Sequence, residues 1–399
     1  MKKRGKRVFW LFVTVLMGVL LLLVLTAGST KEKVTVEEWV IPHLAPLSGP
    51  YAGFGIECMW ACQYAIEEIN AAGGVAGKPM RMPEYDGAGD PHKSVAAMSR
   101  ILDTKPLVMV GPHITPTITA VGAMLVEAEV YSLAAGAGAD STSPFSPWVF
   151  TTLPWQTTLC GAGVKEWANQ NPNMKKVVPI RDVADEWYMN CVKTQTKVLE
   201  SMGIEVAPVV TFDLKATVDF GPIALAALAH NPDGIWFTSV GDPVAKTIVE
   251  LHRRGFTDHS KIFVHAAADY PGFFEIGEGY IDGCYMSGFY NPQHEGERWK
   301  AIQKAYAADH DLPAGFGCYV GMDLPYLIKD AIEATGVTGD PEKLAEERVM
   351  MKDWINDQED YPFVMGDFDI VDGIAMYPIF IYEIEGNQKQ YIGISFVEE

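Results

Sequence analysis

The sequence predicts an α/β protein built of two similar lobes. The chain has 399 residues, which is enough for two compact domains, and 48% of them are hydrophobic against 21% that are charged. Short apolar segments alternate with helical ones, and this alternation runs twice along the chain, as expected for parallel sheets covered by helices. A last segment, residues 361–397, alternates apolar and polar residues and is predicted to be rich in β-strands.

The first strand–loop–helix unit lies within residues 40–78. A short apolar strand ends near Ala45, and a glycine-rich loop follows over residues 48–55. The helix that comes next places these residues near one face: Ile56, Met59, Trp60, Tyr64, Ala65 and Ile69. It ends at Gly73 and Gly74, since glycine takes the left-handed conformation easily. Ligands bind beyond the carboxyl ends of strands in open α/β sheets, so we expect residues 48–55 to line a site.

Strands and helices continue to alternate as far as residue 147. We expect strands over residues 80–85, 107–110 and 130–133, and helices over 92–103 and 118–127. Residues 134–139 have only small side chains and are predicted to form a loop instead of core. Residues 141–147 are rich in serine and proline and are expected to form a hinge.

The same alternation restarts in the second half of the chain. Helices are expected over residues 155–169, 187–202, 220–230 and 244–254, and strands over 177–181, 206–212, 234–238 and 262–266. Two further helices, 298–309 and 319–334, have no strands beside them and are expected to pack on the first lobe. We therefore predict an N-terminal lobe (34–150 plus 290–360) and a C-terminal lobe (151–289 plus 361–399). Three hinge crossings are expected near residues 145–155, 286–292 and 355–362.

The N-terminus carries an export signal. A basic cluster precedes an apolar run over residues 8–25, and small residues, Thr26, Ala27 and Gly28, then suit a signal peptidase. The run is also close to the length of a membrane span. Residues 1–28 are therefore either a cleaved signal peptide or a retained anchor, and both predict a periplasmic body.

The charge of the chain limits its partners. The formal net charge is −20. The leader, residues 1–28, contains basic residues and no acidic one, so the body without it is more negative still. So acidic a body repels nucleic acid and anionic lipid, and we expect neither as a partner. Contact with a membrane is expected only through the leader or a membrane-bound partner, and we expect a monomer.

The body contains six cysteines: Cys58, Cys62, Cys160, Cys191, Cys284 and Cys318. Export permits disulfides, and six thiols allow 15 pairings, but buried free thiols are an equal alternative. No C-x-x-C motif is present, which disfavours zinc ribbons and thioredoxin chemistry. His113 has no second ligand at zinc spacing and is expected to be a packed loop residue, so we predict neither a metal nor a cofactor.

Several stretches resemble one known family. They are P-L-S-G-x-x-A-x-x-G at 46–55, E-E-I-N-A-A-G-G-V-A-G-K at 67–78, Y-D-x-x-x-D-P at 85–91, V-G-P at 110–112, F-T-T-L-P at 150–154, N-P-D-G-I at 231–235 and F-V-M-G-D-F-D at 363–369. In this order they resemble the exported substrate-binding proteins of ABC transporters, of the branched-chain amino-acid and amide type. The resemblance covers about residues 35–397, and its 67–78 stretch is quite specific.

This resemblance implies the type I periplasmic binding protein fold. In that fold two Rossmann-like lobes with parallel central sheets are joined by a three-strand hinge. The lobes bind one small solute between them and pass it to a membrane permease. By the same resemblance we expect no enzyme, and the chain shows neither a G-x-S-x-G elbow nor a phosphate-binding loop at the right place.

The resemblance also implies site residues in the first lobe. Phe54 matches an aromatic residue near the ligand, and Thr115 matches a hydroxyl that binds a ligand carboxylate. Ala134, Ala135 and Gly136 match a loop whose backbone N–H groups bind the same carboxylate, which suits an anion.

In the second lobe the resemblance implies Trp187 or Tyr188 at the start of a helix, with Trp155 nearby. Two positions depart from the family. Its ammonium-binding acid is matched by Ala267, with Asp269 nearest, and one of its aromatic residues is matched by Gly241, with Asp242 beside it.

A buried ammonium needs a charged partner. The ligand is therefore either an amino acid held by Asp269 or Asp242, or an aromatic or aliphatic carboxylate without an amine. The expected function is capture of such a solute for an ABC permease. The alternative is a membrane-anchored sensory domain of the same fold, and retention of residues 8–25 would discriminate the two.

Overall fold

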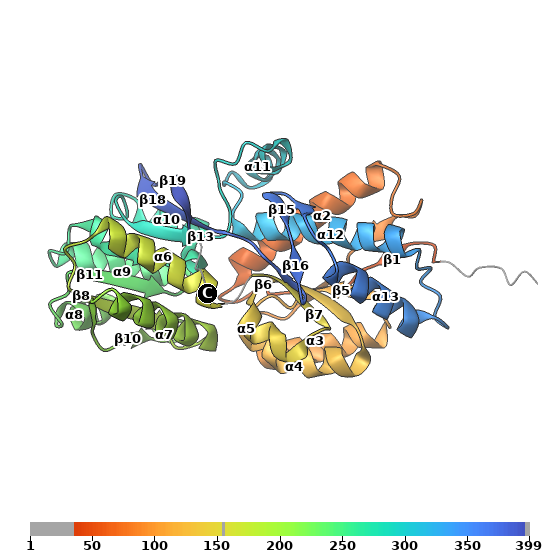
Figure 1. Ribbon diagram of the computed structural model, residues 1–399, viewed down its shortest axis with the longest axis horizontal. Helices are drawn as coiled ribbons and strands as arrows, with labels where there is room; N and C mark the ends of the chain where they lie inside the picture. Colours follow the sequence, from red (N-terminus) through yellow and green to blue (C-terminus); the bar gives the residue numbers. More distant parts are fainter. Residues whose placement is uncertain (1–35, 154–155, 396–399) are drawn as a thin grey trace, which may run out of the picture.

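The computed structural model describes residues 36–153 and 156–395. Figure 1 shows that they form two α/β lobes, which lie side by side along the long axis of the molecule. Each lobe contains a mostly parallel sheet with helices packed against it. The predicted fold, two α/β lobes with central parallel sheets, is confirmed.

The first lobe is built on a seven-stranded sheet with the strand order β16-β17-β7-β6-β5-β2-β4. Neighbouring strands are parallel except β16 and β17, which pair antiparallel. In chain order the strands are β2 (His43–Ala45), β4 (Glu84–Asp86), β5 (Val108–Val110), β6 (Tyr131–Gly138), β7 (Val149–Leu153), β16 (Ile370–Val371) and β17 (Ile374–Ala375). Two small sheets adjoin it, β1 (Trp39–Val40) with β3 (Met80–Arg81) and β14 (Tyr361–Phe363) with β15 (Gly366–Phe368).

The helices of the first lobe come from distant parts of the chain. They are α2 (Ala52–Ala71), α3 (Pro91–Asp103), α4 (Thr115–Ala128), α5 (Ala139–Thr142), η1 (Ser143–Phe145), α11 (Glu297–His310), α12 (Phe316–Thr335) and α13 (Leu344–Asn356). Helix α12 packs closely on α2, because a Cβ on Gly321 would lie 2.5 Å from the carbonyl oxygen of Cys58. The Tyr306 ring of α11 packs edge-on against Trp60 of α2, with ring centroids 4.9 Å apart. The prediction that these two late helices return to the first lobe is confirmed.

The second lobe has an eight-stranded sheet with the order β10-β8-β11-β12-β13-β18-β19, and β9 pairs with β8. Its strands are β8 (Lys176–Asp182), β9 (Glu205–Val206), β10 (Val210–Phe212), β11 (Gly234–Thr238), β12 (Ile262–Val264), β13 (Tyr285–Gly288), β18 (Ile379–Glu385) and β19 (Gln388–Ser395). Its helices are α6 (Gln156–Gln170), α7 (Glu186–Ser201), α8 (Gly221–Leu228), α9 (Gly241–Arg253), η2 (His259–Lys261), η3 (Ala266–Ala268) and α10 (Pro271–Gly277). Strands β18 and β19 form an antiparallel hairpin, whose tight turn has Gly386 and Asn387 at positive φ, 57° and 61°.

The third crossing between the lobes differs from the prediction. Strand β17 pairs with β7 in the first sheet, and β18 then pairs with β13 in the second, so the chain crosses at residues 376–378 instead of 355–362. Residues 361–375, which we expected in the C-terminal lobe, therefore lie with the first sheet. The alternating pattern predicted the strands but could not tell which sheet each one joins.

Two local expectations also differ. Residues 134–138 continue β6 instead of forming a loop, and Ala134 and Ala135 are fully buried. Small side chains suit this place, because a Cβ on Gly136 would lie 2.8 Å from the carbonyl oxygen of His113. On α2, Ile56 is exposed, although the helical spacing placed it on the buried face.

No helix in the described ranges, 36–153 and 156–395, is long and apolar enough to cross a membrane. The leader, with its predicted signal or anchor, lies outside the described residues.

Candidate functional site

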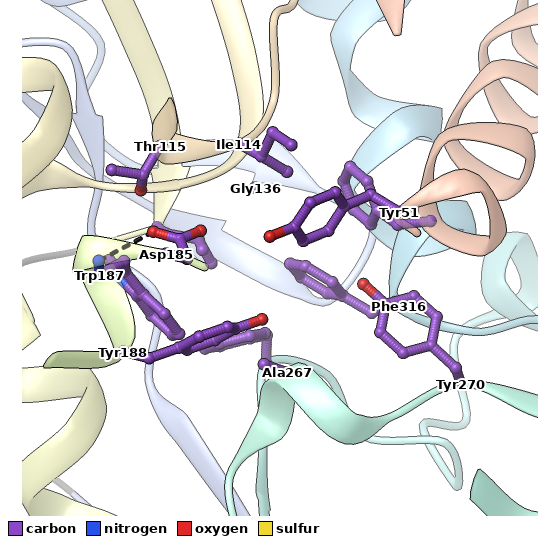
Figure 2. A pocket seen from close by; sticks show the side chains of 13 residues that line it. Tyr51, Ile114, Thr115, Gly136, Asp185, Trp187, Tyr188, Ala267, Tyr270 and Phe316 are labelled. Carbon is purple, nitrogen blue, oxygen red and sulfur yellow. Dashed lines mark hydrogen bonds between the residues drawn. The ribbon is translucent and has the colours of Figure 1, made fainter. Parts of the chain in front are cut away.

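A cavity lies between the two lobes, and we call it the interlobe cavity. Its volume is about 50 Å³, well below the roughly 150 Å³ of a cavity that admits benzene, so a solute must enter while the lobes stand further apart. Figure 2 shows the side chains around it. The lining residues are Tyr51, Phe54, Ile114, Thr115, Gly136, Leu153, Asp185, Trp187, Tyr188, Ala267, Tyr270, Phe289 and Phe316.

The first lobe supplies its residues from the carboxyl edge of its sheet. Tyr51 and Phe54 stand at the start of α2, directly after the glycine-rich loop, and Thr115 begins α4. The Phe54 ring packs against Phe316, with centroids 5.6 Å apart, and Phe316 in turn lies 4.6 Å from Phe289 of the second crossing. These three phenylalanines form an apolar wall, and the Thr115 hydroxyl lies 3.1 Å from that of Ser141.

The second lobe supplies the start of α7. Asp185 is the N-cap of this helix, and its Oδ1 accepts a hydrogen bond from the backbone N–H of Trp187 at 2.8 Å. Trp187 and Tyr188 follow directly, with their rings 5.5 Å apart. The cap therefore fixes the turn of the chain that directs both aromatic side chains into the interlobe cavity, as Figure 2 shows.

The carboxyl group of Asp185 is almost completely buried, with 5% of the residue exposed. Burial raises its pKa to about 6, and the neighbouring charges of Asp182 and Glu186 act in the same direction, while the hydrogen bond from Trp187 opposes them. At neutral pH the carboxyl group is therefore mostly ionised. Burying this charge costs free energy, and a positively charged ligand would reduce that cost.

The phenols of the cavity remain neutral. Burial raises the pKa values of Tyr51, Tyr188 and Tyr270, and the nearby carboxylates add to this shift. The Tyr51 hydroxyl is buried and has no hydrogen-bond partner among the described residues. It points into the interlobe cavity in Figure 2, so it is available to a solute.

The structure brings together six of the predicted site residues. They are Phe54, Thr115, Gly136, Trp187, Tyr188 and Ala267, and all of them line the interlobe cavity. Trp155 lies outside the described residues.

Four other predicted residues do not line this cavity. Ala134 and Ala135 are buried within β6, and the Ala135 N–H donates to Nδ1 of His113 at 3.0 Å. Gly241 is buried against α10, where a Cβ would lie 2.9 Å from that of Phe273. Asp269 faces a different cavity.

This second cavity, of about 540 Å³, lies between α10, the β18–β19 turn and the residues before α12. Asp269 is occupied there by an ion pair, with its Oδ2 2.6 Å from Nζ of Lys389, and the two side chains are only 6% and 8% exposed. Glu57 also borders this cavity. Burial raises its pKa to about 8, and its Oε2 accepts the N–H of Gly317 at 3.0 Å.

Sequence reasoning did not find several lining residues, notably Tyr51, Asp185, Tyr270 and Phe316. A local signal existed for Asp185, because an acid two residues before an aromatic helix start is a normal N-cap. Tyr51 belongs to the loop that we expected to line the site. Tyr270 and Phe316 are brought in by tertiary packing, and nothing in their immediate sequence distinguishes them.

Two buried clusters have the composition of metal sites, His43–Cys58–His113 and Cys160–Cys191–His265. In the first, Nδ1 of His113 accepts a backbone N–H, so the ring proton lies on Nε2, which is then not free to bind a metal. His265 is in the same state, because its Nδ1 accepts the N–H of Ala267 at 3.0 Å. Neither cluster is arranged as a metal centre.

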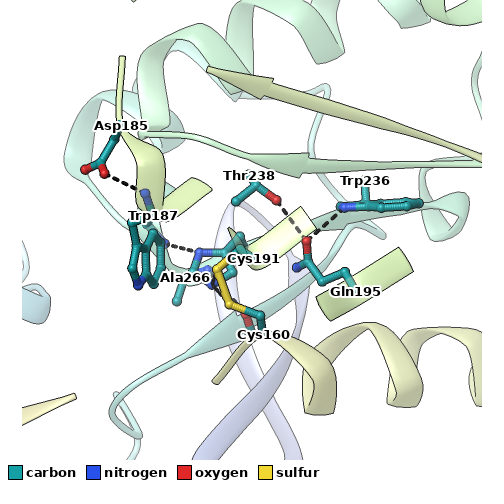
Figure 3. The surroundings of a disulfide bond; sticks show 11 residues. Cys160, Asp185, Trp187, Cys191, Gln195, Trp236, Thr238 and Ala266 are labelled. Atoms are coloured by element: carbon teal, nitrogen blue, oxygen red, sulfur yellow. Dashed lines mark hydrogen bonds between the residues drawn. A yellow bond between two sulfur atoms is a disulfide. The ribbon is translucent and has the colours of Figure 1, made fainter. Parts of the chain in front are cut away.

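In the second cluster the two cysteines form a disulfide that joins α6 to α7 (Figure 3). Cys191 lies one turn after Trp187, so the bond holds the helix that carries the cavity residues. Cys58, Cys62, Cys284 and Cys318 are free and buried. Both alternatives for the cysteines, a disulfide and buried thiols, therefore occur in this chain.

The fold agrees with the relatives of the chain. The family model described as periplasmic binding protein matches residues 38–389. The chain belongs to this family. It is 22% identical over 315 residues to an amino acid binding protein from Pseudomonas aeruginosa, covering 77% of this chain and 81% of that protein. It is 31% identical over 146 residues to a Leu/Ile/Val-binding protein homologue from Brucella melitensis, covering 35% of this chain and 38% of the relative.

Several solved structures share the fold. A leucine-binding protein from Thermotoga maritima has a TM-score of 0.78 at 21% identity, over 90% of this chain and 99% of that one. A branched-chain amino acid transporter substrate-binding protein from Streptococcus pneumoniae, in complex with isoleucine, gives 0.78 at 19% identity with the same coverage. A solute-binding protein of an ABC transporter from R. palustris, in complex with benzoate, gives 0.78 at 17% identity, over 91% and 98%. The prediction of the type I periplasmic binding protein fold is confirmed.

Proposed function

We propose that this protein is an exported receptor that captures a small solute in the interlobe cavity and delivers it to an ABC permease. The observation that carries this proposal is the cavity itself, whose lining comes from the carboxyl edges of both sheets and from the second crossing. Ligands of open α/β sheets bind at this edge. Some relatives are named for amino acids, and others were solved with isoleucine or benzoate. They support a small solute, either an amino acid or a small carboxylate.

Binding follows from the division of the cavity between the lobes. A solute that enters while the lobes are apart first contacts Phe54 and Thr115 of the first lobe. Rotation about the three crossings then adds Trp187, Tyr188 and Asp185. The contacts with the second lobe form only on closure, so they supply the differential free energy that favours the closed state.

The closed pair of lobes would then be recognised by the permease. We also propose that the protein works as a monomer and releases its solute unchanged, because the lining residues include no nucleophile paired with a base. We propose export to the periplasm because of the family match and the predicted leader.

A thermal-shift screen tests the proposal. The full chain, expressed with its own leader and purified as exported, is screened against amino acids, amides and small aromatic or aliphatic carboxylates. A bound solute raises the melting temperature by mass action. Failure of every compound, together with no co-purified solute in mass spectra of the denatured protein, would overturn the proposal.

A further inference from the structure

We infer that the interlobe cavity selects solutes with a positively charged ammonium group, and that Asp185 is the carboxylate that pairs with this group. The inference rests on the proposed function, because it takes the interlobe cavity as the solute site. It narrows the solute class from amino acids and carboxylates in general to amines, including amino acids and methylated amines.

The charge of the cavity is the first argument. Among the described lining residues Asp185 is the one acid, and none is Arg, Lys or His. A solute with a carboxylate and no amine would bring a second negative charge into a closed space that already holds a buried one, with no cation among the described lining residues. Such an arrangement costs several kcal/mol, by a rough estimate, and an ammonium group removes this cost.

The other candidate acids of the second lobe are not available. Asp269 is paired with Lys389 at 2.6 Å and borders the second cavity. Asp242 is exposed in the first turn of α9 and does not line the interlobe cavity. Asp185, which follows β8, therefore takes the role of the acid that is missing at Ala267, which follows β12.

The aromatic side chains are the second argument. Seven of the thirteen lining residues are aromatic: Tyr51, Phe54, Trp187, Tyr188, Tyr270, Phe289 and Phe316. Figure 2 shows Tyr51 from the first lobe and Tyr188 and Trp187 from the second on opposite sides of the space, with Asp185 at one end. Aromatic faces around a desolvated cation stabilise it, and groups of them recognise methylated ammonium ions. The phenols are neutral, so they add polar oxygens without adding charge.

The remaining polar groups suit the rest of a zwitterion. The Tyr51 hydroxyl lacks a partner among the described residues and can accept from an N–H or donate to a carboxylate. The Thr115 hydroxyl, with that of Ser141 at 3.1 Å, offers a second donor at the first-lobe side. An amino acid or a betaine would place its carboxylate there and its cation toward Asp185.

The test compares amines with shape-matched compounds that lack the positive charge. The pairs are leucine with 4-methylpentanoate, glycine betaine with 3,3-dimethylbutanoate, and choline with 3,3-dimethylbutan-1-ol. Calorimetric titration of the full chain should give binding by at least one amine and at least tenfold weaker binding by its counterpart. Equal or tighter binding by the counterparts that lack the ammonium nitrogen overturns the inference and leaves the proposed function intact. Binding by no compound of either class counts against both.

Two variants distinguish a specific role of Asp185 in binding from the general effect of removing a negative charge near the cavity. Asp185→Asn keeps an N-cap residue for α7, whereas Glu186→Gln removes the same charge from an exposed neighbour that does not line the cavity. We expect Asp185→Asn to lose at least tenfold in affinity for the bound amine and Glu186→Gln to bind as the parent does. Equal affinities for the two variants, with both folded by their melting curves, would contradict the role of Asp185.

The pH profile gives an independent readout. The titratable groups around Asp185 are Asp182, Glu186 and Tyr188 on its own segment, and Tyr51 and Tyr270 on other elements that line the cavity. Because burial raises the pKa of Asp185 to about 6, the affinity for a permanently charged amine should fall by about tenfold between pH 7 and pH 5. The Asp185→Asn variant should show no such fall, and a fall of the same size in it would contradict the inference.

Discussion

At the scale of single residues, Asp185 combines two roles that pull in opposite directions. Its Oδ1 caps α7 through the Trp187 N–H, which stabilises the helix, while the burial of its charge works against folding. Residues of this kind are typical of binding sites, where a group is held ready for a ligand at the expense of stability.

Asp185→Asn should therefore stabilise the solute-free protein. The pKa of Asp185 is raised to about 6 in the folded state from an ordinary value of 3.8. Protonation of Asp185 thus favours folding below the ordinary pKa, and this contribution is lost as pH rises through about 6. At pH 7 the substitution should add about 1–3 kcal/mol to the free energy of unfolding. Denaturant unfolding at pH 7 measures this, with Glu186→Gln as the control, and a less stable Asp185→Asn variant would contradict it.

The sequence could not choose this residue among the acids of the second lobe. Asp185, Asp242 and Asp269 each follow a strand of that lobe, but the resemblance pointed only to Asp242 and Asp269. Which one faces the cavity depends on the turn after each strand and on partners from far along the chain. Lys389, which occupies Asp269, lies 120 residues later.

At the scale of elements, the cavity residues are held by short, tightly fixed segments. The start of α7 is fixed by its cap and by the Cys160–Cys191 disulfide, and the region of η3 by the Asp269–Lys389 pair from β19. Strand β6 comes close to Phe54 at Gly136, where a Cβ would lie 3.0 Å from Cζ of the ring. The small side chains of residues 134–138 suggested a loop, but they are small because of this packing, which the linear pattern does not contain.

The Asp269–Lys389 pair should be essential for stability. Lys389→Met leaves the Asp269 charge buried without its cation, which costs about 3–5 kcal/mol. Thermal unfolding should show a clear loss in this variant. The double variant Lys389→Met with Asp269→Asn should recover most of it, because the uncompensated charge is then gone. A double variant no more stable than the single one would show that the pair does not act as described.

Reduction of the disulfide should loosen the second lobe. It closes a loop with a sequence separation of 31, and the chain-entropy model assigns about 3–4 kcal/mol to such a link. Thiol labelling of the denatured protein should find four free cysteines without reductant and six with it. The reductant should also lower the melting temperature, and six reactive thiols before reduction would rule the link out.

At the scale of the whole molecule, two lobes joined by three crossings enclose a small cavity with contacts from both sides. The double α/β alternation predicted the two lobes, and the return of α11 and α12 to the first lobe was predicted from their lack of neighbouring strands. The third crossing was misplaced, because β14 to β17 and β18 to β19 have the same alternating pattern. The pairing of β17 with β7 places the crossing after β17. Strand pairing between distant segments is not visible in a local sequence pattern.

Closure should be visible in solution. The interlobe cavity is too small to admit a solute in this arrangement, so uptake requires the lobes to stand further apart, and contacts of the solute with both lobes then favour closure. Small-angle X-ray scattering should show a smaller radius of gyration when solute is added at saturating concentration. An unchanged radius would mean that the lobes do not move on binding.

The most direct test of the central claim, a solute held between the two lobes, is the affinity of Trp187→Ala. Trp187 contributes a buried aromatic surface from the second lobe to the interlobe cavity. Calorimetric titration with a solute found in the screen should give binding at least about tenfold weaker than in the parent protein, the scale of a lost buried aromatic side chain. Unchanged affinity in a folded Trp187→Ala variant would place the solute elsewhere and contradict the account.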